Sequence, residues 1–218
     1  MNVDWAWVES NLPAIAVMVR DHAILAVLPV LIALVISLPL GYLVFRAGKG
    51  ANGILAFLGA IYSIPSLALF VALPVLLLKP ILDPLNVVVA LTIYSVALLV
   101  RSVVDGLRSV PGAVTQAASA VGFGRFRRLL RVELPLAMPV VFAGLRVATV
   151  SNIALVSVAV LVGSGALGKL FVSGFNRLFY TPVIVGMVLS VLLALIADVV
   201  ILLIQRGALP WARRGRTA

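Results

Sequence analysis

Five apolar runs divide the chain, and each approaches the length that a helix needs to cross a lipid bilayer. A helix requires about 20 mostly apolar residues to span the hydrocarbon core. The runs lie at residues 23–45, 54–78, 85–104, 135–162 and 182–204. Because the apolar residues are continuous and do not alternate with polar ones, the pattern predicts helices and not strands. We therefore expect an all-α integral membrane protein with about five transmembrane helices.

The segments outside these runs predict a simple organisation. Trp5 and Trp7 precede the first run, with Pro13 between them and it. Paired tryptophans fit a helix that lies along the outer membrane surface, and an extension that packs on the first span is an equal alternative. Three parts are expected. An external or interfacial N-terminal segment covers residues 1–22, a transmembrane body covers residues 23–205 with one long loop at 105–134, and a basic tail covers residues 206–218.

The distribution of Lys and Arg predicts how the chain is oriented. Twelve of the 17 basic residues fall in the connections on one side of the predicted spans, four fall on the other side, and Arg146 lies within a span. Basic residues accumulate in cytoplasmic loops. We therefore expect the long loop and the C-terminus in the cytoplasm and the N-terminus outside.

Composition supports a membrane protein and excludes several other classes. The chain is 63% hydrophobic and 11% charged, whereas soluble domains carry roughly 25% charged residues. The net charge of +10 comes without a nucleic-acid-binding motif. Cysteine is absent and His22 is the single histidine, so thiolate and multi-histidine metal sites are excluded within this chain.

The long loop is the most informative part of the sequence. Pro111 suits the first turn of a helix, and residues 113–121 contain strong helix formers. Gly122 and Gly124 allow the reversal that ends a helix, and a basic helix is expected over residues 125–132. The first helix is predicted to present a small apolar surface made of Ala117, Ala118 and Val121.

This loop resembles the "EAA…G…LP" loop of the permease subunits of binding-protein-dependent ABC importers. The motif positions are Gln116, Ala117, Ala118, Gly122, Leu134 and Pro135. The family's leading Glu is Gln116 here, which leaves the helix geometry possible and removes a charge. The resemblance implies a type I importer permease whose loop forms a coupling helix that docks on a cytoplasmic ATPase.

Further segments resemble the glycine betaine/choline-type osmoprotectant permeases, at residues 61–70, 92–107, 133–150 and 163–168. The resemblance implies a multi-pass protein of a prokaryotic plasma membrane that carries a quaternary ammonium solute. Its partners would be a second permease subunit, in a homodimer or a heterodimer, an external substrate-binding protein and ATPase subunits that bind ATP and Mg. This chain itself would hold no cofactor and catalyse no reaction. An importer of another small, amino-acid-like solute is the alternative.

Residues 163–169 contain a glycine pattern that is typical of phosphate-binding loops. Such a loop needs a preceding strand and a following helix, and the version with a lysine needs a hydroxyl residue for magnesium. A predicted span precedes this segment, Leu170 stands where the hydroxyl residue would be, and the segment is expected outside the cell. We therefore interpret it as a tight turn.

Polar residues within the spans are candidates for the translocation path. A quaternary ammonium ion can bind to aromatic faces, so Tyr62 and Tyr94 are plausible contacts. Ser, Thr and Asn also serve ordinary helix packing in membranes, and that alternative stays open. The candidate path residues are Tyr62, Ser63, Pro65, Tyr94, Thr149 and Asn152.

Two charged residues within the spans lie at compatible depths. Arg146 is eleven residues beyond Pro135, about 16 Å along a helix, and Asp198 is eight residues before Arg206, about 12 Å from the same side. Charges at membrane depth usually pair or face water. We expect an Arg146–Asp198 ion pair that joins the fourth and fifth spans.

Other classes of membrane protein fit the sequence less well. Ion-coupled secondary transporters usually contain internal repeats, which are not evident here. A membrane-embedded hydrolase needs a nucleophile and a base at one depth, whereas His22 is expected outside and Asp198 has no catalytic partner. A channel would leave the cytoplasmic loop unexplained.

Overall fold

The computed structural model describes residues 3–163 and 165–211, and every regular element in these two stretches is a helix. Four helical stretches are long and apolar enough to cross a membrane, and one bent pair of shorter helices brings the number to five. The expected all-α membrane fold is confirmed. In chain order the elements are α1 (Trp5–Arg46), η1 (Gly48–Gly50), α2 (Ala51–Tyr62), α3 (Ser66–Leu77), α4 (Pro84–Arg108), α5 (Gly112–Ala120), α6 (Arg125–Arg128), η2 (Leu129–Glu133), α7 (Leu134–Val158), η3 (Ala159–Val162), α8 (Gly168–Asn176) and α9 (Tyr180–Ala208).

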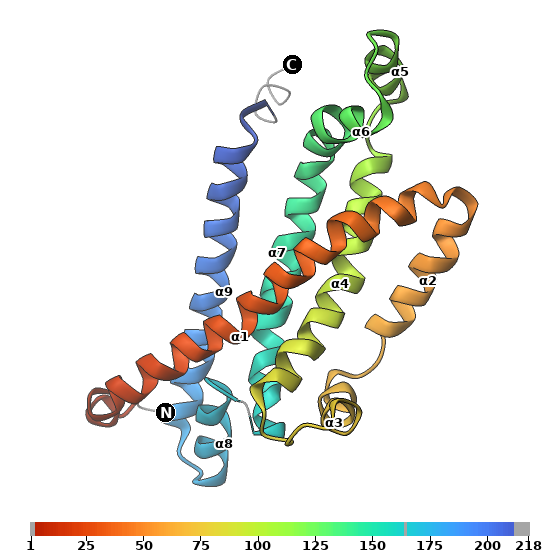
Figure 1. The fold of residues 1–218 in the computed structure, drawn as a ribbon. Helices are drawn as coiled ribbons and strands as arrows, with labels where there is room; N and C mark the ends of the chain where they lie inside the picture. The colour runs from red at the N-terminus through yellow and green to blue at the C-terminus, as the bar shows by residue number, and fades with distance from the viewer. Residues whose placement is uncertain (1–2, 164, 212–218) are drawn as a thin grey trace.

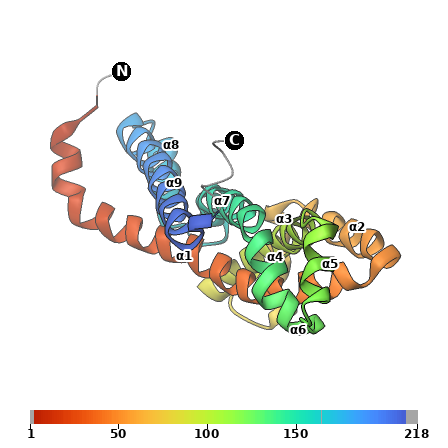
Figure 2. The same cartoon turned by 90° about the horizontal axis from the view of Figure 1, so that it is seen from above.

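The long helices run between two ends of the molecule (Figure 1). Helices α5 and α6 and the end of α9 lie at one end, which we call the α5 end. The N-terminus, α3 and α8 lie at the other, which we call the α8 end. Helix α4 packs between α1 and α7, and α9 packs on α7 and α8. Seen from above, the N-terminal part of α1 curves away from this bundle (Figure 2).

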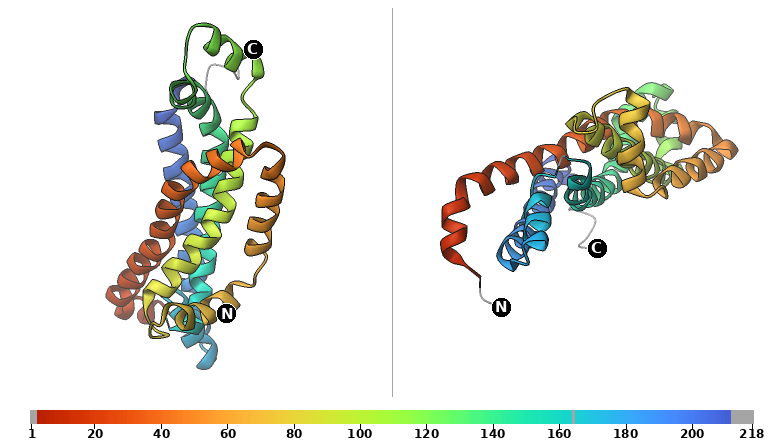
Figure 3. Two further views of the ribbon diagram at one scale, coloured as in Figure 1. Left: turned by 45° about the vertical axis from the view of Figure 1, so that its right-hand side comes forward. Right: turned by 90° about the horizontal axis from the view of Figure 1, so that it is seen from below.

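Helix α1 extends much further than the first predicted span. It is a single helix of 42 residues that continues through Pro13, Pro29 and Pro39, so no boundary separates residues 1–22 from the span. A proline removes one backbone donor, and the neighbouring turns keep their hydrogen bonds. Figure 3 shows the helix bending near its N-terminus, where the extension stands beside α8 and α9. The predicted N-terminal segment is therefore part of the first helix.

The first residues of α1 are attached to the start of α9. Asp4 accepts a hydrogen bond from Trp7 N at 3.0 Å and caps the helix. The backbone N–H of Asp4 donates to Thr181 Oγ1 at 3.0 Å, and the Trp7 ring packs edge-on against Phe179 with 5.8 Å between centroids. These contacts hold the two helix starts together at the α8 end.

The second predicted span is not one continuous helix. Helices α2 and α3 meet at a bend of 93°, and the break falls at residues 63–65. Pro65 has no N–H for the carbonyl of Ile61 and disfavours the helical conformation of Ile64. The span predicted over residues 54–78 is therefore this bent pair, which leads from the α5 end to the α8 end (Figure 1).

The remaining spans begin and end close to their predicted positions. Pro84 starts α4 behind Asp83, whose carboxylate accepts from Leu85 N at 2.9 Å, and the helix continues to Arg108. A π-helical turn, η2, leads from α6 into α7 without a break. Helix α9 starts at Tyr180, so Pro182 lies in its first turn, where a missing donor costs nothing.

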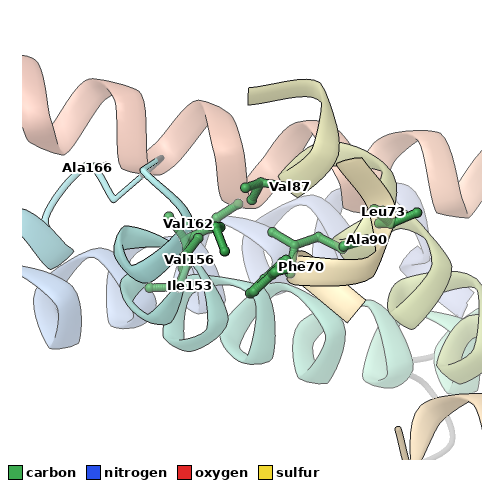
Figure 4. Packing of buried hydrophobic residues seen from close by; sticks show 11 residues of the cluster. Phe70, Leu73, Val87, Ala90, Ile153, Val156, Val162 and Ala166 are labelled. Atoms are coloured by element: carbon green, nitrogen blue, oxygen red, sulfur yellow. The ribbon is translucent and has the colours of Figure 1, made fainter. Parts of the chain in front are cut away.

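Small residues bring the central helices close together. A Cβ atom added to Gly106 of α4 would lie 2.8 Å from the carbonyl oxygen of Ala137 in α7. Close backbone approach of this kind is a main source of helix association in membranes. Nearer the α8 end, Phe70, Val87, Ala90 and Val156 pack in a buried cluster from α3, α4 and α7 (Figure 4).

We predict that Gly106→Val lowers the free energy of unfolding by about 1–3 kcal/mol, because the new side chain must displace the backbone of α7. Gly53→Val is the matched control, since nothing lies within 4 Å of an added Cβ in α2. Thermal unfolding of the purified variants in detergent measures both effects. Equal losses at the two positions would contradict the close contact between α4 and α7.

Candidate functional site

The loop that was predicted to carry function projects from the α5 end (Figure 1). Pro111 is extended and starts α5, and Gly122 has a φ of 85°, a left-handed conformation that favours glycine. Gly124 is extended and precedes α6. Gln116, Ala117 and the 75% exposed Val121 face outward.

Ala118 does not belong to this outward surface. It is only 7% exposed and is the buried residue of α5, which packs against α6 and η2. Because α5 packs against α6 and η2, one face of α5 is used for that contact, and Ala118 lies on this inner face. The exposed surface of the loop is therefore formed by residues on either side of it, and its prediction as a single patch with Ala117 and Val121 is wrong.

A charged brace connects the loop to α7. Arg128 donates through Nε to Glu133 Oε1 at 2.6 Å and through a terminal nitrogen to Ser119 Oγ at 2.7 Å. Glu133 is only 7% exposed, and Leu134 and Pro135 begin α7 directly after it. Hydrogen bonds between ionised groups are about twice as strong as neutral ones. The brace therefore joins the end of α5 to the first turn of α7.

Two tyrosines meet at the break between α2 and α3. Their rings pack edge to face, with 5.7 Å between the centroids of Tyr62 and Tyr94. The Tyr94 hydroxyl donates to the carbonyl of Ile64, and Ser63 Oγ donates to the carbonyl of Gly59 at 2.9 Å. The Tyr94 hydroxyl thus supplies a donor at the break before Pro65, whereas the Gly59 carbonyl also keeps its helical bond from Ser63 N at 3.0 Å. Tyr94 is 4% exposed and Tyr62 43%, so Tyr94 supports the more exposed ring.

The exposed ring of Tyr62 lines a cavity of about 260 Å³ between α2 and α4. Arg101 and Asp105 also line this cavity, and they form an ion pair with 3.9 Å between Nε and Oδ2. A smaller cavity touches Tyr62, Tyr94 and Asn152 together. The structure therefore brings three of the six candidate path residues to one place.

Asn152 and Thr149 are buried in helix contacts. Asn152 donates to the carbonyl of Ala26 at 3.2 Å and to Ser95 Oγ at 3.1 Å, so it joins α1, α4 and α7. Thr149 donates to the carbonyl of Leu145 within its own helix at 2.8 Å. For Thr149 the packing alternative describes the geometry better than a place in the path.

Arg146 and Asp198 form an ion pair between α7 and α9. Nε of Arg146 lies 2.6 Å from Asp198 Oδ1, and a terminal nitrogen lies 2.7 Å from Oδ2. This fork-shaped contact uses both carboxylate oxygens and fixes the relative depth of the two helices. The two side chains that the sequence placed at similar depths therefore meet in the structure.

The glycine-rich segment after η3 forms a turn. Gly163 has a φ of 86° and leads towards α8, so a helix and not a strand precedes the segment. Residue 164 lies outside the described residues. A phosphate-binding loop requires the strand, so this geometry agrees with the interpretation as a tight turn.

The sequence model of one protein family matches residues 33–209, most of the chain. That family is described as the binding-protein-dependent transport system inner membrane component.

The chain belongs to this family.

Individual relatives are permease subunits of ABC importers. The glycine betaine/carnitine/choline transport system permease protein OpuCD of Bacillus subtilis is 35% identical over 190 residues, which cover 87% of this permease and 82% of that protein. The osmoprotectant import permease protein OsmW of Salmonella typhimurium is 33% identical over 190 residues, which cover 86% and 88% of the two chains. The chain is thus an ABC importer permease, a transport subunit.

Solved importer structures share the fold of the permease. An inward-facing structure of the MetNI methionine ABC transporter matches with a TM-score of 0.72 at 20% identity, over 90% of this chain and 98% of that one. An amino acid ABC transporter that was crystallised with histidines matches with a TM-score of 0.78 at 17% identity, over 95% and 100%. At these identities the likeness establishes the architecture alone.

Sequence reasoning missed two contacts of the permease. His22 was given no contact from the sequence, and in the structure it is fully buried and donates through Nε2 to the carbonyl of Ile153 at 2.8 Å. Arg128 was expected only as part of a basic helix, and its contact with Glu133 was not predicted. The available signals were a single histidine beside a span and one acidic residue among arginines. The partner of each could be identified only from the fold.

We predict that Arg146→Asp and Asp198→Arg each lower the melting temperature of the permease by roughly 3–8 °C, because each leaves two like charges in contact within the bundle. The double variant should recover at least half of the loss, since the pair is restored in reverse. Exchanging Arg20 and Asp21, an exposed ion pair, is the control and should change little. A double variant no better than the singles would contradict a structural ion pair.

Proposed function

We propose that the permease forms the translocation path for a small osmoprotectant such as glycine betaine, choline or a related quaternary ammonium compound. The observation that carries this proposal is similarity over most of the chain to permeases whose names give these solutes. An exposed tyrosine on a broken helix, beside a cavity, is a suitable group for such a cation.

Transport is driven by a separate cytoplasmic ATPase that binds the ATP and Mg, and this chain contributes no cofactor. The ATPase docks on the loop at residues 111–135. The exposed Ala117 and Val121 on a projecting helix support this, since small apolar residues allow close contact with a groove. Movement of α5 would reach α7 through the Ser119–Arg128–Glu133 brace.

The α5 end faces the cytoplasm and the α8 end faces outward. Most basic residues of the connections lie at the α5 end, in agreement with the positive-inside rule. Solute then arrives at the α8 end from an external substrate-binding protein, as the family description suggests. A second permease subunit, identical or related, completes the path, because Tyr62 and its cavity lie at an open face of α2 and α4.

We expect Ala117→Arg to reduce co-purification of the ATPase and solute-coupled ATP hydrolysis by at least about tenfold, because a large charged side chain would separate the two surfaces. Ala47→Arg, which adds the same side chain at another exposed position of the α5 end, is the control. Pull-down and ATPase measurements on reconstituted complexes give both quantities. Unchanged coupling in Ala117→Arg would refute the docking assignment.

For the path we expect Tyr62→Leu to lower uptake of glycine betaine about five- to thirtyfold, whereas Tyr62→Phe stays within about twofold, since a phenyl face still attracts a quaternary ammonium ion. Phe57→Leu, at an exposed aromatic residue of the same helix, is the matched control. The measurement is uptake of labelled solute into proteoliposomes. Equal losses at both positions, or equally fast uptake of amino acids that lack a quaternary ammonium group, would favour an importer of another small polar solute.

A further inference from the structure

A strongly basic cavity lies beneath the loop that carries α5 and α6. It has a volume of about 330 Å³ and lies between the last turns of α1 and α4 and the helices α5 and α6. Four arginines line it, and they come from three helices: Arg46 from α1, Arg108 from α4, and Arg125 and Arg128 from α6. The proposed path uses none of them.

The charges that line this cavity are mostly uncompensated. Glu133 is the one acidic residue of its lining, and Arg128 pairs with it at 2.6 Å. Arg108 donates to the neutral amide of Asn52 at 3.3 Å. Within residues 3–163 and 165–211, the side chains of Arg46 and Arg125 form no hydrogen bond or ion pair. Three exposed guanidinium groups therefore line one cavity with no counter-charge left for them in its lining, which makes the cavity attractive to an anion.

We propose that this cavity binds a phosphate-bearing anion. A guanidinium fork matches the oxygens of a phosphate group and can donate two hydrogen bonds to it. Helices from the membrane body and helices from the loop both contribute arginines, so a bound phosphate bridges the two. The ligand thereby holds the coupling loop against the ends of α1 and α4.

The surroundings of the cavity favour an anionic phospholipid headgroup as the source of this phosphate. Arg46 and Arg108 are the last residues of two spans, the level at which basic side chains meet lipid phosphates. Phe45 and Leu107 give the same cavity an apolar wall on the membrane side. A soluble phosphate shares the chemistry of the headgroup, but it has no apolar part that could contact this wall. The inference goes beyond the transport proposal and does not depend on the transported solute.

The test uses the full-length chain in detergent with added phosphatidylglycerol or phosphatidylcholine, and native mass spectrometry measures the lipid that stays bound. We expect the wild type to retain phosphatidylglycerol in preference. Arg46→Gln/Arg125→Gln should weaken this retention about tenfold, because both unpaired forks are lost. Arg127→Gln/Arg131→Gln removes the same charge from exposed positions outside the cavity and should behave like the wild type.

Inorganic phosphate distinguishes the two sources. If millimolar phosphate does not displace the lipid, the headgroup is the ligand. If phosphate stabilises the lipid-free chain and the cavity variant abolishes that stabilisation, the ligand is a soluble phosphate. Equal retention of phosphatidylglycerol by the cavity and control variants, with no effect of phosphate, overturns the proposal. Should circular dichroism show that the double variant is unfolded, Arg125→Gln against Arg127→Gln gives the same comparison. ATPase coupling plays no part in this binding measurement, so its outcome is separate from that of the transport proposal.

Discussion

The hydrocarbon core of a membrane offers no water to a backbone carbonyl, and this constraint shapes the break in the second span of the permease. Where Pro65 interrupts the second span, Tyr94 donates to the carbonyl of Ile64 and Ser63 to that of Gly59. The polar side chains that permit the break are thus the ones that lie beside the proposed path. Asn152 and His22 likewise donate to backbone carbonyls of neighbouring helices, so most polar groups inside this bundle serve helix contacts first.

Helix α7 connects the separate parts of the molecule. At one end it continues from the braced loop, in its middle it holds α9 through the Arg146–Asp198 pair, and further along it contacts α1 and α4 through Asn152. Helix α9 is otherwise exposed along most of its apolar length, as expected for a helix that faces lipid. Helix α7 therefore links the loop to the membrane body, and its contacts include those that Asn152 makes near the aromatic pair.

Much of this architecture follows from local sequence, and the exceptions have physical reasons. Span positions were predictable because apolar length is a property of neighbours in the chain. The Arg146–Asp198 pair was also accessible, since depth along a helix can be counted from its end. The bend of the second span required knowing that Tyr94 could replace a lost hydrogen bond, and the inward face of Ala118 depends on how α5 turns back on η2. Contacts between distant segments, such as that of His22 with Ile153, cannot be predicted from the local pattern of apolar and polar residues.

The π-helical turn η2 has a consequence for how such loops can diverge. A π turn accommodates one residue more than an α-helical turn, and one residue corresponds to a rotation of about 100° around a helix axis. Losing a single residue between Leu129 and Glu133 would restore a regular helix. Because the π turn already holds the extra residue within one turn, α6 would keep its side of the axis of α7. A loop of this kind can therefore lose one residue at η2 and still present α5 and α6 on the same side of the membrane domain.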